Sequence, residues 1–399
     1  MWVDHMDVTS AVVLAGGEGS RLRPLTRYRP KPLLPAATTP ILEHVFDQLL
    51  EAGVTEITVV VGYGKNRVQA YFGPTYRNVP LTYVTQEQQL GSGHALLAAE
   101  SEVDESTLVV NGDQFVESPI IRDVIEAHDG MAAATLGLLT RMDVKPYGGV
   151  LVEDGSVTEI VENPIDERTY RFNAGVYAFE PAIFDAIRAA EPRAGEQSLT
   201  DGITELLEAS ATVDGVISQG LWVDATYPWD LLDVSFDLFE AGIIEGSRDD
   251  NVADSARVHE SAIVREPVVI GPDCEVGAGA VIGPYACLGE NATVGSNAVI
   301  ERSVIDADTR VGASATVIDC VTGVGVTIGN GTTIPGGPGD VRVGNRIFED
   351  EYLGALLADR VNDHGGSTYV PGAIVGPEAT IKAGATVRGT LSEETEVRP

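Results

Sequence analysis

The chain of 399 residues is poor in basic residues: 26 lysines and arginines stand against 60 aspartates and glutamates, a formal net charge of −34. Only four of the basic residues are lysines, Lys31, Lys65, Lys145 and Lys382. Such a surface repels the phosphate backbone of nucleic acids, so we expect no nucleic-acid partner. Because salt screens this self-repulsion, the composition also predicts a halophilic type of surface.

Long apolar runs and paired cysteines are also lacking. No run approaches the ~18 residues needed to span a bilayer, and residues 1–10 lack the apolar centre of a signal peptide. We therefore expect a soluble, cytoplasmic protein with no membrane partner. The three cysteines are odd in number and lack C-x-x-C spacing, which predicts buried, reduced thiols at Cys274, Cys287 and Cys320.

A glycine-rich turn follows an apolar run at residues 11–15, which predicts a central strand of a parallel sheet. Gly16, Gly17 and Gly19 would let main-chain N–H groups converge on phosphate oxygens. An ordinary tight turn between strand and helix is the alternative. The spacing fits neither G-x-G-x-x-G nor G-x-x-x-x-G-K-[ST], so the dinucleotide and Walker-type patterns are both missing.

Two cationic residues follow this turn. Arg21 offers a planar fork to phosphate oxygens, and Lys31 offers a point charge. Residues 14–26 read L-A-G-G-E-G-S-R-L-R-P-L-T, and P-K-P follows at residues 30–32. This stretch resembles the signature of sugar-1-phosphate nucleotidylyltransferases of the glucose-1-phosphate thymidylyltransferase and N-acetylglucosamine-1-phosphate uridylyltransferase type. The resemblance implies catalytic roles for Arg21 and Lys31, and nucleotide contacts from Leu14, Ala15 and the three glycines.

The second half of the chain has a period of six. Glycine follows five of the aliphatic residues in this series directly, and a period of six fits neither a helix nor an ordinary strand. It fits a solenoid whose short flat sides each point one aliphatic side chain inward. This is the hexapeptide pattern of left-handed parallel β-helices, which depart from the right-handed crossover rule. The nine positions are Val252, Val258, Val264, Ile270, Val276, Ile282, Leu288, Val294 and Ile300.

The register of six returns later in the chain, after a glycine-rich interruption. We expect an inserted loop at about residues 335–371, with a loop or short helix projecting around 349–359. The polar stretch 246–251 predicts a linker, which gives a nucleotidyltransferase domain at 6–240 and a β-helix domain at 250–399. The returning positions are Val311, Val317, Ile328, Ile334, Val375, Ile381 and Val387.

The first domain alternates apolar runs with helical patterns. Strands are predicted at 57–61 and 108–111, and helices near 41–52 and 95–99. This alternation predicts an α/β fold, a Rossmann-like mixed sheet layered by helices. Ligands of such sheets bind at the carboxyl ends of the strands.

Residues 86–95, Q-E-Q-Q-L-G-S-G-H-A, resemble the base-binding segment of the family in its uridylyltransferase form. The amide of Gln86 can both donate to and accept from a pyrimidine edge. Gly91 permits close backbone approach, and Ser92 joins the nucleotide-binding set. The alternative is a polar loop that opens a helix. The segment favours UTP over dTTP without fixing the choice.

Two aspartates are candidate ligands of Mg²⁺. Asp113 ends the apolar run V-V-N-G-D, where a hard oxygen could reach a metal on the nucleotide phosphates. Asp224 lies in G-L-W-V-D-A-T-Y-P-W, which is similar to the family element G-x-W-x-D-x-G-T-P-W except that Ala225 replaces glycine and Thr226 is displaced. Each aspartate alone could instead cap a helix or a turn. The resemblance implies that both bind the metal.

Three further residues match the strands that surround the sugar in the family: Gly148, Glu162 and Asn173. A carboxylate and an amide can meet vicinal hydroxyls in both hydrogen-bonding directions. Many members carry E-K-P where this chain has Asn163, so a lysine near the sugar phosphate is missing. Arg168 or Arg171 could substitute for it.

The implied reaction needs no covalent nucleophile. An oxygen of the sugar 1-phosphate attacks the α-phosphorus of a nucleoside triphosphate, and pyrophosphate leaves in line. The whole chain resembles archaeal bifunctional sugar-1-phosphate nucleotidylyltransferase/acetyltransferases. However, residues 312–316 read G-A-S-A-T where those enzymes carry P-H-x-x-Y. His364 could serve as the general base for acetyl transfer, or it could be a solvated loop residue.

Three hypotheses therefore stand. The first is a nucleotidylyltransferase whose solenoid assembles subunits, as trimers or their multiples. The second is a bifunctional enzyme that also acetylates glucosamine 1-phosphate. The third is a nucleotide-sugar-binding scaffold without catalysis. The presence of the family's charged residues argues against it: Arg21, Lys31, Asp113 and Asp224.

Overall fold

The computed structural model describes residues 8–141, 148–162, 164, 168–193, 195–244 and 251–399. The chain forms two compact units. Unit 1 comprises Met1–Glu18 and Ile41–Val223, and unit 2 comprises Gly19–Pro40 and Asp224–Pro399. The predicted limits at 240 and 250 stay a prediction. The compact units are divided differently, because residues 19–40 and the segment from Asp224 onward cluster with the C-terminal region.

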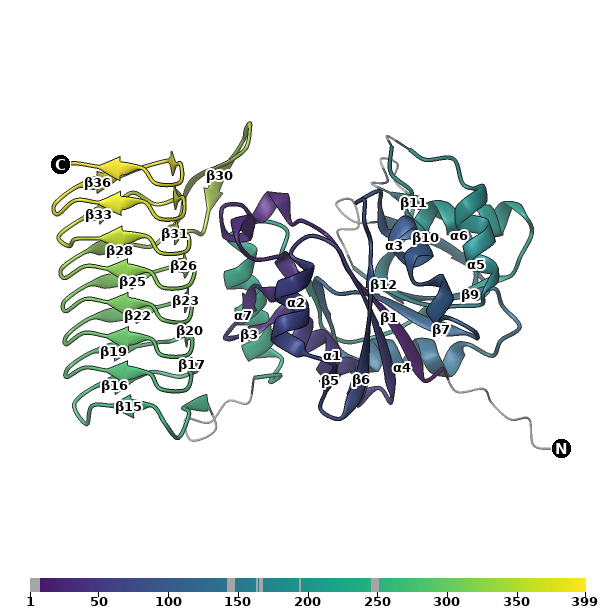
Figure 1. Cartoon of the computed structure of the whole chain (residues 1–399), viewed down its shortest axis with the longest axis horizontal. Helices are drawn as coiled ribbons and strands as arrows, with labels where there is room; N and C mark the ends of the chain where they lie inside the picture. Colours follow the sequence, from purple (N-terminus) through teal and green to yellow (C-terminus); the bar gives the residue numbers. More distant parts are fainter. Residues whose placement is uncertain (1–7, 142–147, 163, 165–167, 194, 245–250) are drawn as a thin grey trace. The chain divides into compact units, whose positions relative to one another are not determined.

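Unit 1 is built on a ten-stranded mixed sheet (Figure 1). Strand β1 lies inside it, parallel to both β4 and β7, and its fully buried Val13 pairs with Val59 and Val110. Burial on both faces explains the unbroken apolar run. The sheet order is β10 (Gly148–Glu153), β11 (Ser156–Glu162), β13 (Val213–Ile217), β9 (Ala134–Leu139), β12 (Arg171–Phe179), β7 (Thr107–Asn111), β1 (Ser10–Ala15), β4 (Glu56–Val61), β6 (Val79–Thr85) and β5 (Thr75–Tyr76).

Amphipathic helices pack beside this sheet. In α1 the apolar residues Ile41, Leu42, Val45, Phe46 and Leu49 are buried, as a stripe at helical spacing requires. The expected strands and helices are confirmed within two or three residues, and so is the α/β class. The helices are α1 (Ile41–Glu51), α2 (Lys65–Phe72), α3 (Ser92–Ala98), α4 (Ser118–Ala127), α5 (Ala182–Ala189) and α6 (Leu199–Glu208), with one short 3-10 turn, η4 (Glu100–Glu102).

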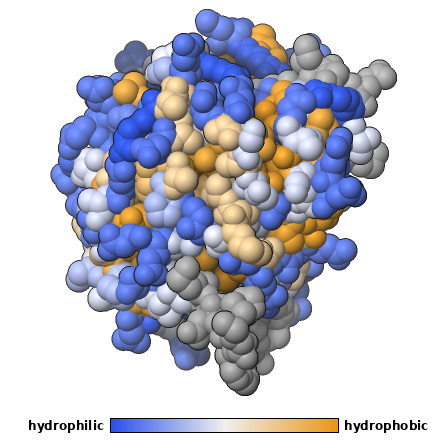
Figure 2. Space-filling view, turned by 90° about the vertical axis from the view of Figure 1, so that its right-hand side faces the viewer, coloured by the Kyte–Doolittle hydropathy of each residue, from blue (hydrophilic) through white to orange (hydrophobic). Residues whose placement is uncertain are grey.

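Hydrophilic residues cover much of the face of unit 1 seen in Figure 2, with apolar residues appearing between them. This agrees with the large excess of acidic residues in the chain. None of the helices in the described parts of the chain is long and apolar enough to cross a membrane.

Unit 2 contains three stacked parallel sheets, hereafter the solenoid, as expected for a left-handed β-helix (Figure 1). The first sheet holds β15 (Arg257–Val258), β18 (Glu275–Val276), β21 (Thr293–Val294), β24 (Arg310–Val311), β27 (Thr327–Ile328), β32 (Asn362–Asp363), β35 (Thr380–Ile381) and β38 (Glu396–Val397). The second holds β16 (Ile263–Val264), β19 (Val281–Ile282), β22 (Val299–Glu301), β25 (Thr316–Ile318), β28 (Thr333–Pro335), β33 (Thr368–Tyr369) and β36 (Thr386–Val387). The third holds β17 (Val268–Ile270), β20 (Ala286–Leu288), β23 (Ser303–Ile305), β26 (Cys320–Thr322), β31 (Ala355–Leu357), β34 (Ala373–Val375) and β37 (Thr390–Leu391).

The period of six is confirmed by the register of these strands. Val258 pairs with Val276, which pairs with Val294, so one coil takes three hexapeptides. Ile270 and the five positions after it in the series of nine are at most 3% exposed. Val252, Val258 and Val264 are partly buried and pack against the same core at the first coils.

The insertion after Ile334 is a β-hairpin, so the expected loop or short helix around 349–359 is wrong. Strands β29 (Gly339–Val343) and β30 (Arg346–Glu351) pair antiparallel. The solenoid resumes at β31, which pairs with β26. The hairpin is therefore shorter than the expected insertion, and residues 355–369 belong to the coils.

The remaining part of unit 2 joins short elements to the solenoid. Helix α7 (Asp230–Glu240) contacts β23 and β26, and Ser235 on α7 accepts a hydrogen bond from Ala37 N. The three cysteines are buried and unpaired, as expected. The short elements are η1 (Ser20–Leu22), η2 (Leu25–Arg27), η3 (Lys31–Leu33), β2 (Pro35–Ala36) and β3 (Thr39–Pro40), while β14 (Trp222–Asp224) pairs with β8 (Gln114–Val116) where the two units meet in sequence.

Candidate active site

The predicted phosphate turn begins directly after β1. Leu14 and Ala15 are buried in the sheet. A Cβ on Gly16 would lie 2.7 Å from Gln86 Oε1, so the turn and the predicted base-binding amide are in contact. Gln89 Nε2 donates to Gly16 O at 2.9 Å, a contact that the sequence did not reveal. A Cβ on Gly17 would meet no heavy atom of the described chain within 4 Å, which leaves room for a ligand.

The glutamine-rich segment also bonds to itself. Gln86 is buried, and its Nε2 donates to Gly91 O at 3.1 Å. Gly91 has φ +104°, and a Cβ there would lie 2.3 Å from Gln197 O. Ser92 Oγ accepts from Leu199 N at 3.0 Å. Gly91 and Ser92 thus pack against the start of α6, and their nucleotide-binding role stays a prediction.

Asp113 lies at the carboxyl end of β7, on the same sheet edge as the phosphate turn. Gly112 N donates to Leu14 O at 2.8 Å, which fixes the two strand ends against each other. Asn111 Nδ2 donates to Gln114 Oε1 at 3.0 Å and closes the turn around the aspartate. This is the edge where α/β sheets bind ligands.

The three predicted sugar residues come together in unit 1. Gly148 pairs with Glu162 between β10 and β11, and a Cβ on Gly148 would lie 3.8 Å from Asn173 Cβ. Asn173 Nδ2 donates to Tyr177 OH at 2.8 Å, and its Oδ1 accepts from Gly175 N. Burial raises the pKa of Tyr177 to about 12, so its hydroxyl stays protonated at neutral pH.

The substitutes considered for the missing lysine have other partners. Arg168 makes a two-pronged ion pair with Glu159 at 2.5 and 3.0 Å, and Arg171 Nη1 donates to Thr140 Oγ1. Asn163, where the lysine is missing, lies outside the described residues. Glu162 Oε1 accepts from Thr200 Oγ1 at 2.6 Å, a neighbour that the sequence did not suggest.

Three of the predicted charged residues lie in unit 2. Lys31 Nζ lies 2.7 Å from Asp224 Oδ1, and the two side chains are only 9% and 7% exposed. Gly19 has φ +64°, and a Cβ there would press against Lys31 Cβ at 2.8 Å. The Arg21 guanidinium carbon lies 5.9 Å from the centre of the Tyr227 ring. Arg21, Lys31 and Asp224 are thus brought to one region.

The altered element around Asp224 is hydrogen-bonded internally. Thr226 Oγ1 donates to Asp224 Oδ2 at 2.7 Å, so the displaced threonine still orients the aspartate. The N–H groups of Thr226 and Tyr227 both donate to Asp230 Oδ2. Burial, only partly offset by these two bonds, raises the pKa of Asp230 to about 6.

The two predicted metal ligands lie in different units, Asp113 in unit 1 and Asp224 in unit 2. Within the described ranges, no three residues among histidine, cysteine, aspartate and glutamate form a cluster that could hold a metal. Mg²⁺ commonly takes one or two protein carboxylates and completes its shell with phosphates and water. Each aspartate taken by itself offers the hard oxygen ligand that Mg²⁺ takes.

His364 lies on the outside of the solenoid. Its Nε2 is 3.3 Å from Asn362 Nδ2, and it lines an open depression together with Arg310 and Asn330. The exposed ring is consistent with a solvated histidine.

Comparison with known proteins identifies the family. The model of the nucleotidyl transferase family matches residues 10–240, more than half of the chain, and the model of the GMPPB C-terminal domain matches residues 264–391. The chain belongs to the nucleotidyl transferase family. Both predicted regions of the chain are thus matched by a family model.

Two named relatives of this nucleotidyl transferase are nucleotidyltransferases that act on glucose 1-phosphate. It is 36% identical to the UTP–glucose-1-phosphate uridylyltransferase AglF of Haloferax volcanii over 225 residues, 55% of this chain and 92% of that protein. It is 34% identical to the bifunctional protein GlmU of Methanococcus maripaludis, over 62% of this chain and 59% of that protein. It is 33% identical to the glucose-1-phosphate thymidylyltransferase of Streptomyces antibioticus, over 62% of this chain and 72% of that protein.

Solved structures agree on the fold. The UDP-glucose pyrophosphorylase of Acinetobacter baumannii matches with a TM-score of 0.52 and 23% identity, over 58% of this chain and 93% of that one. At this identity the likeness shows the fold of the first region alone.

Proposed function

We propose that this protein condenses UTP or dTTP with glucose 1-phosphate or N-acetylglucosamine 1-phosphate, giving a nucleotide-sugar and pyrophosphate. The observation that carries the proposal is the nearly buried Lys31–Asp224 pair beside Gly19, within the matched signature. A cation held in a nearly buried position is suited to neutralising phosphate oxygens as charge moves between them.

The residues take separate roles in this proposal. Main-chain N–H groups of Gly16, Gly17 and Gly19 would bind the triphosphate, and Gln86 would read the base. Arg21 would hold the β- and γ-phosphates as the leaving group, and Lys31 would bridge the phosphates of both substrates. Such positioning replaces a covalent nucleophile, because in-line displacement at phosphorus depends chiefly on geometry and charge.

The sugar side of the proposal rests on the β10–β12 region. The main chain at Gly148, the carboxylate of Glu162 and the amide of Asn173 would bond the sugar hydroxyls. The amide and the carboxylate between them offer donors and acceptors, which suits neighbouring hydroxyl groups.

Mg²⁺ is the proposed metal, with Asp113 and Asp224 as its protein ligands. The ion would neutralise charge on the triphosphate. Asp224 Oδ1 is bonded to Lys31 Nζ and Oδ2 to Thr226 Oγ1, so these neighbours hold the carboxylate in a defined orientation. Removal of divalent ions with EDTA should abolish turnover, and added Mg²⁺ should restore it.

Two further properties belong to the same proposal. The solenoid would assemble the chain into a homo-oligomer, a trimer or a multiple of it, in the cytoplasm; light scattering after size-exclusion chromatography measures the mass. The charge of −34 would make the protein halophilic. Its unfolding temperature should then rise between low salt and molar KCl, and an unchanged value would contradict this.

The decisive test is a substrate panel. Purified protein with Mg²⁺ is given each common nucleoside triphosphate together with either sugar 1-phosphate, and pyrophosphate release is measured. Release with UTP or dTTP only is the expected result. No release with any pair would refute the proposal and favour a non-catalytic scaffold.

A separate assay addresses acetyl transfer. Thiol release from acetyl-CoA in the presence of glucosamine 1-phosphate would identify a bifunctional enzyme. If His364 were the base, His364→Ala would abolish that release and leave pyrophosphate release unchanged.

A further inference from the structure

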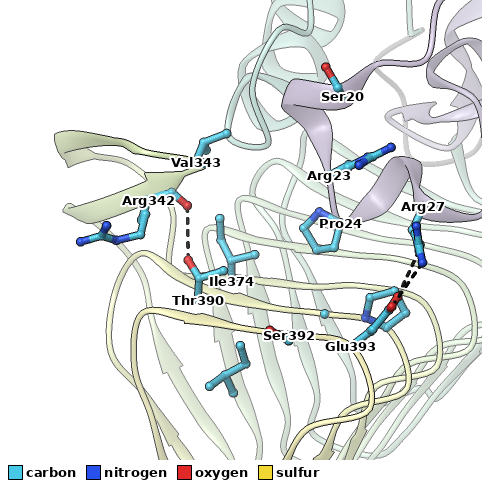
Figure 3. Close-up of a pocket in the computed structure, with 14 residues that line it drawn as sticks. Ser20, Arg23, Pro24, Arg27, Arg342, Val343, Ile374, Thr390, Ser392 and Glu393 are labelled. Atoms are coloured by element: carbon cyan, nitrogen blue, oxygen red, sulfur yellow. Dashed lines mark hydrogen bonds and ion pairs between the residues drawn. The ribbon is translucent and has the colours of Figure 1, made fainter.

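The loop Gly19–Pro40, which carries Arg21 and Lys31, rests on the solenoid through consecutive side chains. Arg27 forms an ion pair with Glu393 at 3.1 and 3.2 Å, drawn as dashed lines in Figure 3. The next residue, Tyr28, places its ring 5.0 Å from the Arg360 guanidinium carbon. The Arg27–Glu393 pair is about half exposed, 48% and 46%, so water and salt weaken it.

Arg29 makes the buried contact of this series. Its Nη2 donates to Asp306 Oδ2 at 2.5 Å and lies 3.7 Å from Asp359 Oδ1. The three side chains are only 14%, 10% and 6% exposed. Burial opposes the charge of the guanidinium, but the two carboxylates outweigh this and raise the pKa of Arg29. Because removing one partner of a buried ion pair leaves the other charge buried and uncompensated, the loss of this contact should affect the loop more than the loss of the exposed one.

The solenoid has an irregularity at this place. The residue after the third strand of a coil is glycine at Gly271, Gly289, Gly323 and Gly376, whereas it is Asp306 after β23, Ala358 after β31 and Ser392 after β37. Asp306 is the acidic residue among these positions. A Cβ on Gly323 would lie 2.2 Å from Asp359 Oδ1. The glycine of the coil between them thus makes room for the second carboxylate. Two acidic side chains on either side of a glycine form a receptor for one guanidinium group.

Both carboxylates are also held from within the solenoid. Asp306 Oδ1 accepts from Ala307 N at 2.7 Å, and Asp359 Oδ1 accepts from Val324 N at 3.0 Å. They are therefore already oriented toward Arg29. Within the described chain Arg29 Nε has no hydrogen-bond partner, and both contacts with the carboxylates come from Nη2.

The solenoid reaches the Asp224 segment as well. Phe348 on the hairpin lies 4.6 Å from the Tyr227 ring and 5.0 Å from the Trp229 ring, which stack on each other. A cavity of about 460 Å³ separates residues 20–27 of the loop from the hairpin residues 342–344 and the last coils (Figure 3). The loop therefore has free space beside Arg27, whereas the Arg29 side chain is only 14% exposed.

We propose that Arg29 is a positioning residue for nucleotidyl transfer, which fixes Arg21 and Lys31 by tying their loop to Asp306 and Asp359 of the solenoid. This inference rests on the proposed function. It gives the solenoid a direct part in the transfer, besides any part in assembly. The loop contact is through charge, so removing one carboxylate should loosen the loop without removing any group that touches the substrates.

The test compares two single substitutions in the full-length protein that remove one negative charge each. Asp306→Asn weakens the buried contact, and Glu393→Gln weakens the exposed one on the same loop. For Asp306→Asn we expect kcat to fall about 10- to 100-fold, because a small displacement of catalytic groups is costly. KM should change less than kcat, and hydrogen exchange should quicken in residues 19–34 but not in the solenoid strands. Glu393→Gln should stay within about twofold of wild type.

Arg29→Lys serves as the second variant, since it keeps the charge but loses the planar guanidinium group, whose Nη2 lies near both carboxylates. It should show an intermediate fall in kcat with the same local rise in exchange. Wild-type kcat and unchanged exchange in both Asp306→Asn and Arg29→Lys would overturn the proposal. The proposal would also be overturned if hydrogen exchange rose uniformly over the whole chain and the loss of activity equalled the fraction of unfolded protein, because the substitutions would then act through global stability. A wild-type protein without pyrophosphate release would reject the proposed function alone, because loop exchange in the variants still tests the attachment.

Discussion

In unit 1 the candidate residues bond mainly to main-chain groups and neutral side chains, whereas in unit 2 they form charged pairs. Gln86 bonds to Gly91 O, and Asn173 to Gly175 N and Tyr177. Lys31 pairs with Asp224, and Arg29 with Asp306. Neutral hydrogen bonds fix the shape of a binding site, whereas charged groups stabilise the charge that develops on the phosphates in the transition state. From this comparison we expect substitutions in unit 1, Asp113 excepted, to act chiefly on substrate affinity, and substitutions in unit 2 to act chiefly on turnover.

The largest effect on kcat is expected from substitutions of the charged candidate residues. Lys31→Ala should lower kcat by at least ~10²-fold, the usual result of removing one group that stabilises the transition state. Asp113→Ala should do the same although Asp113 lies in unit 1, because it is the proposed metal ligand there. Pyrophosphate release measures both.

A matched control for this prediction is Lys65→Ala, because Lys65 is a partly exposed lysine 3.6 Å from Glu87. It should keep wild-type turnover. Lys31→Ala leaves the carboxylate of Asp224 without its ion pair, so circular dichroism should first establish that the variant is folded. Near-normal turnover of the folded Lys31→Ala protein would contradict the expectation that the charged residues of unit 2 determine turnover.

Two glycines of unit 1 sharpen the same comparison. Gly91→Ala forces a side chain into a left-handed conformation and against Gln197 O, so unfolding should become easier by about 2–4 kcal/mol. Gly17→Ala places its methyl group in open space and should change stability by no more than about 0.5 kcal/mol. It should instead raise KM for the nucleotide. Urea denaturation and steady-state kinetics separate the two; equal stability losses would contradict the assignment of Gly17 to a ligand.

A smaller, pH-dependent effect is expected at Asp230. Its folded pKa of about 6 lies above the ordinary value of 3.8, so the folded protein holds a proton that the unfolded chain has released. Stability from this group is therefore present at low pH and lost as pH rises through about 6. Asp230→Asn keeps an oxygen acceptor but carries no charge.

The variant Asp230→Asn should exceed the wild type in unfolding free energy by about 1–2 kcal/mol at pH 8, with the difference shrinking toward pH 4. Thermal and urea unfolding across this pH range provide the measurement. Asp185→Asn, at a side chain 94% exposed, should show no such trend. A difference for Asp230→Asn that is constant with pH would mean that this carboxyl titrates normally.

Local sequence patterns predicted the parts of the fold that repeat or that lie within one continuous segment. Each inward-facing position of the solenoid requires an aliphatic side chain, so Ile282 or Val387 could be placed from spacing alone. The hairpin was missed because β29 and β30 pair with each other and obey no period of six. The Lys31–Asp224 and Arg29–Asp306 contacts join residues 193 and 277 positions apart, which no local pattern encodes. One signal was available for the second: the break in the corner glycines at Asp306.

The three thiols of the solenoid have a practical consequence. Cys274, Cys287 and Cys320 have no exposed surface, and burial raises the pKa of each. Alkylating reagents need an accessible thiolate, so the three thiols of the native protein should not react with maleimides. A cysteine introduced on the surface of each unit would then accept a fluorophore or spin label without removal of the native cysteines, and the distance between the two labels could be measured with and without nucleotide.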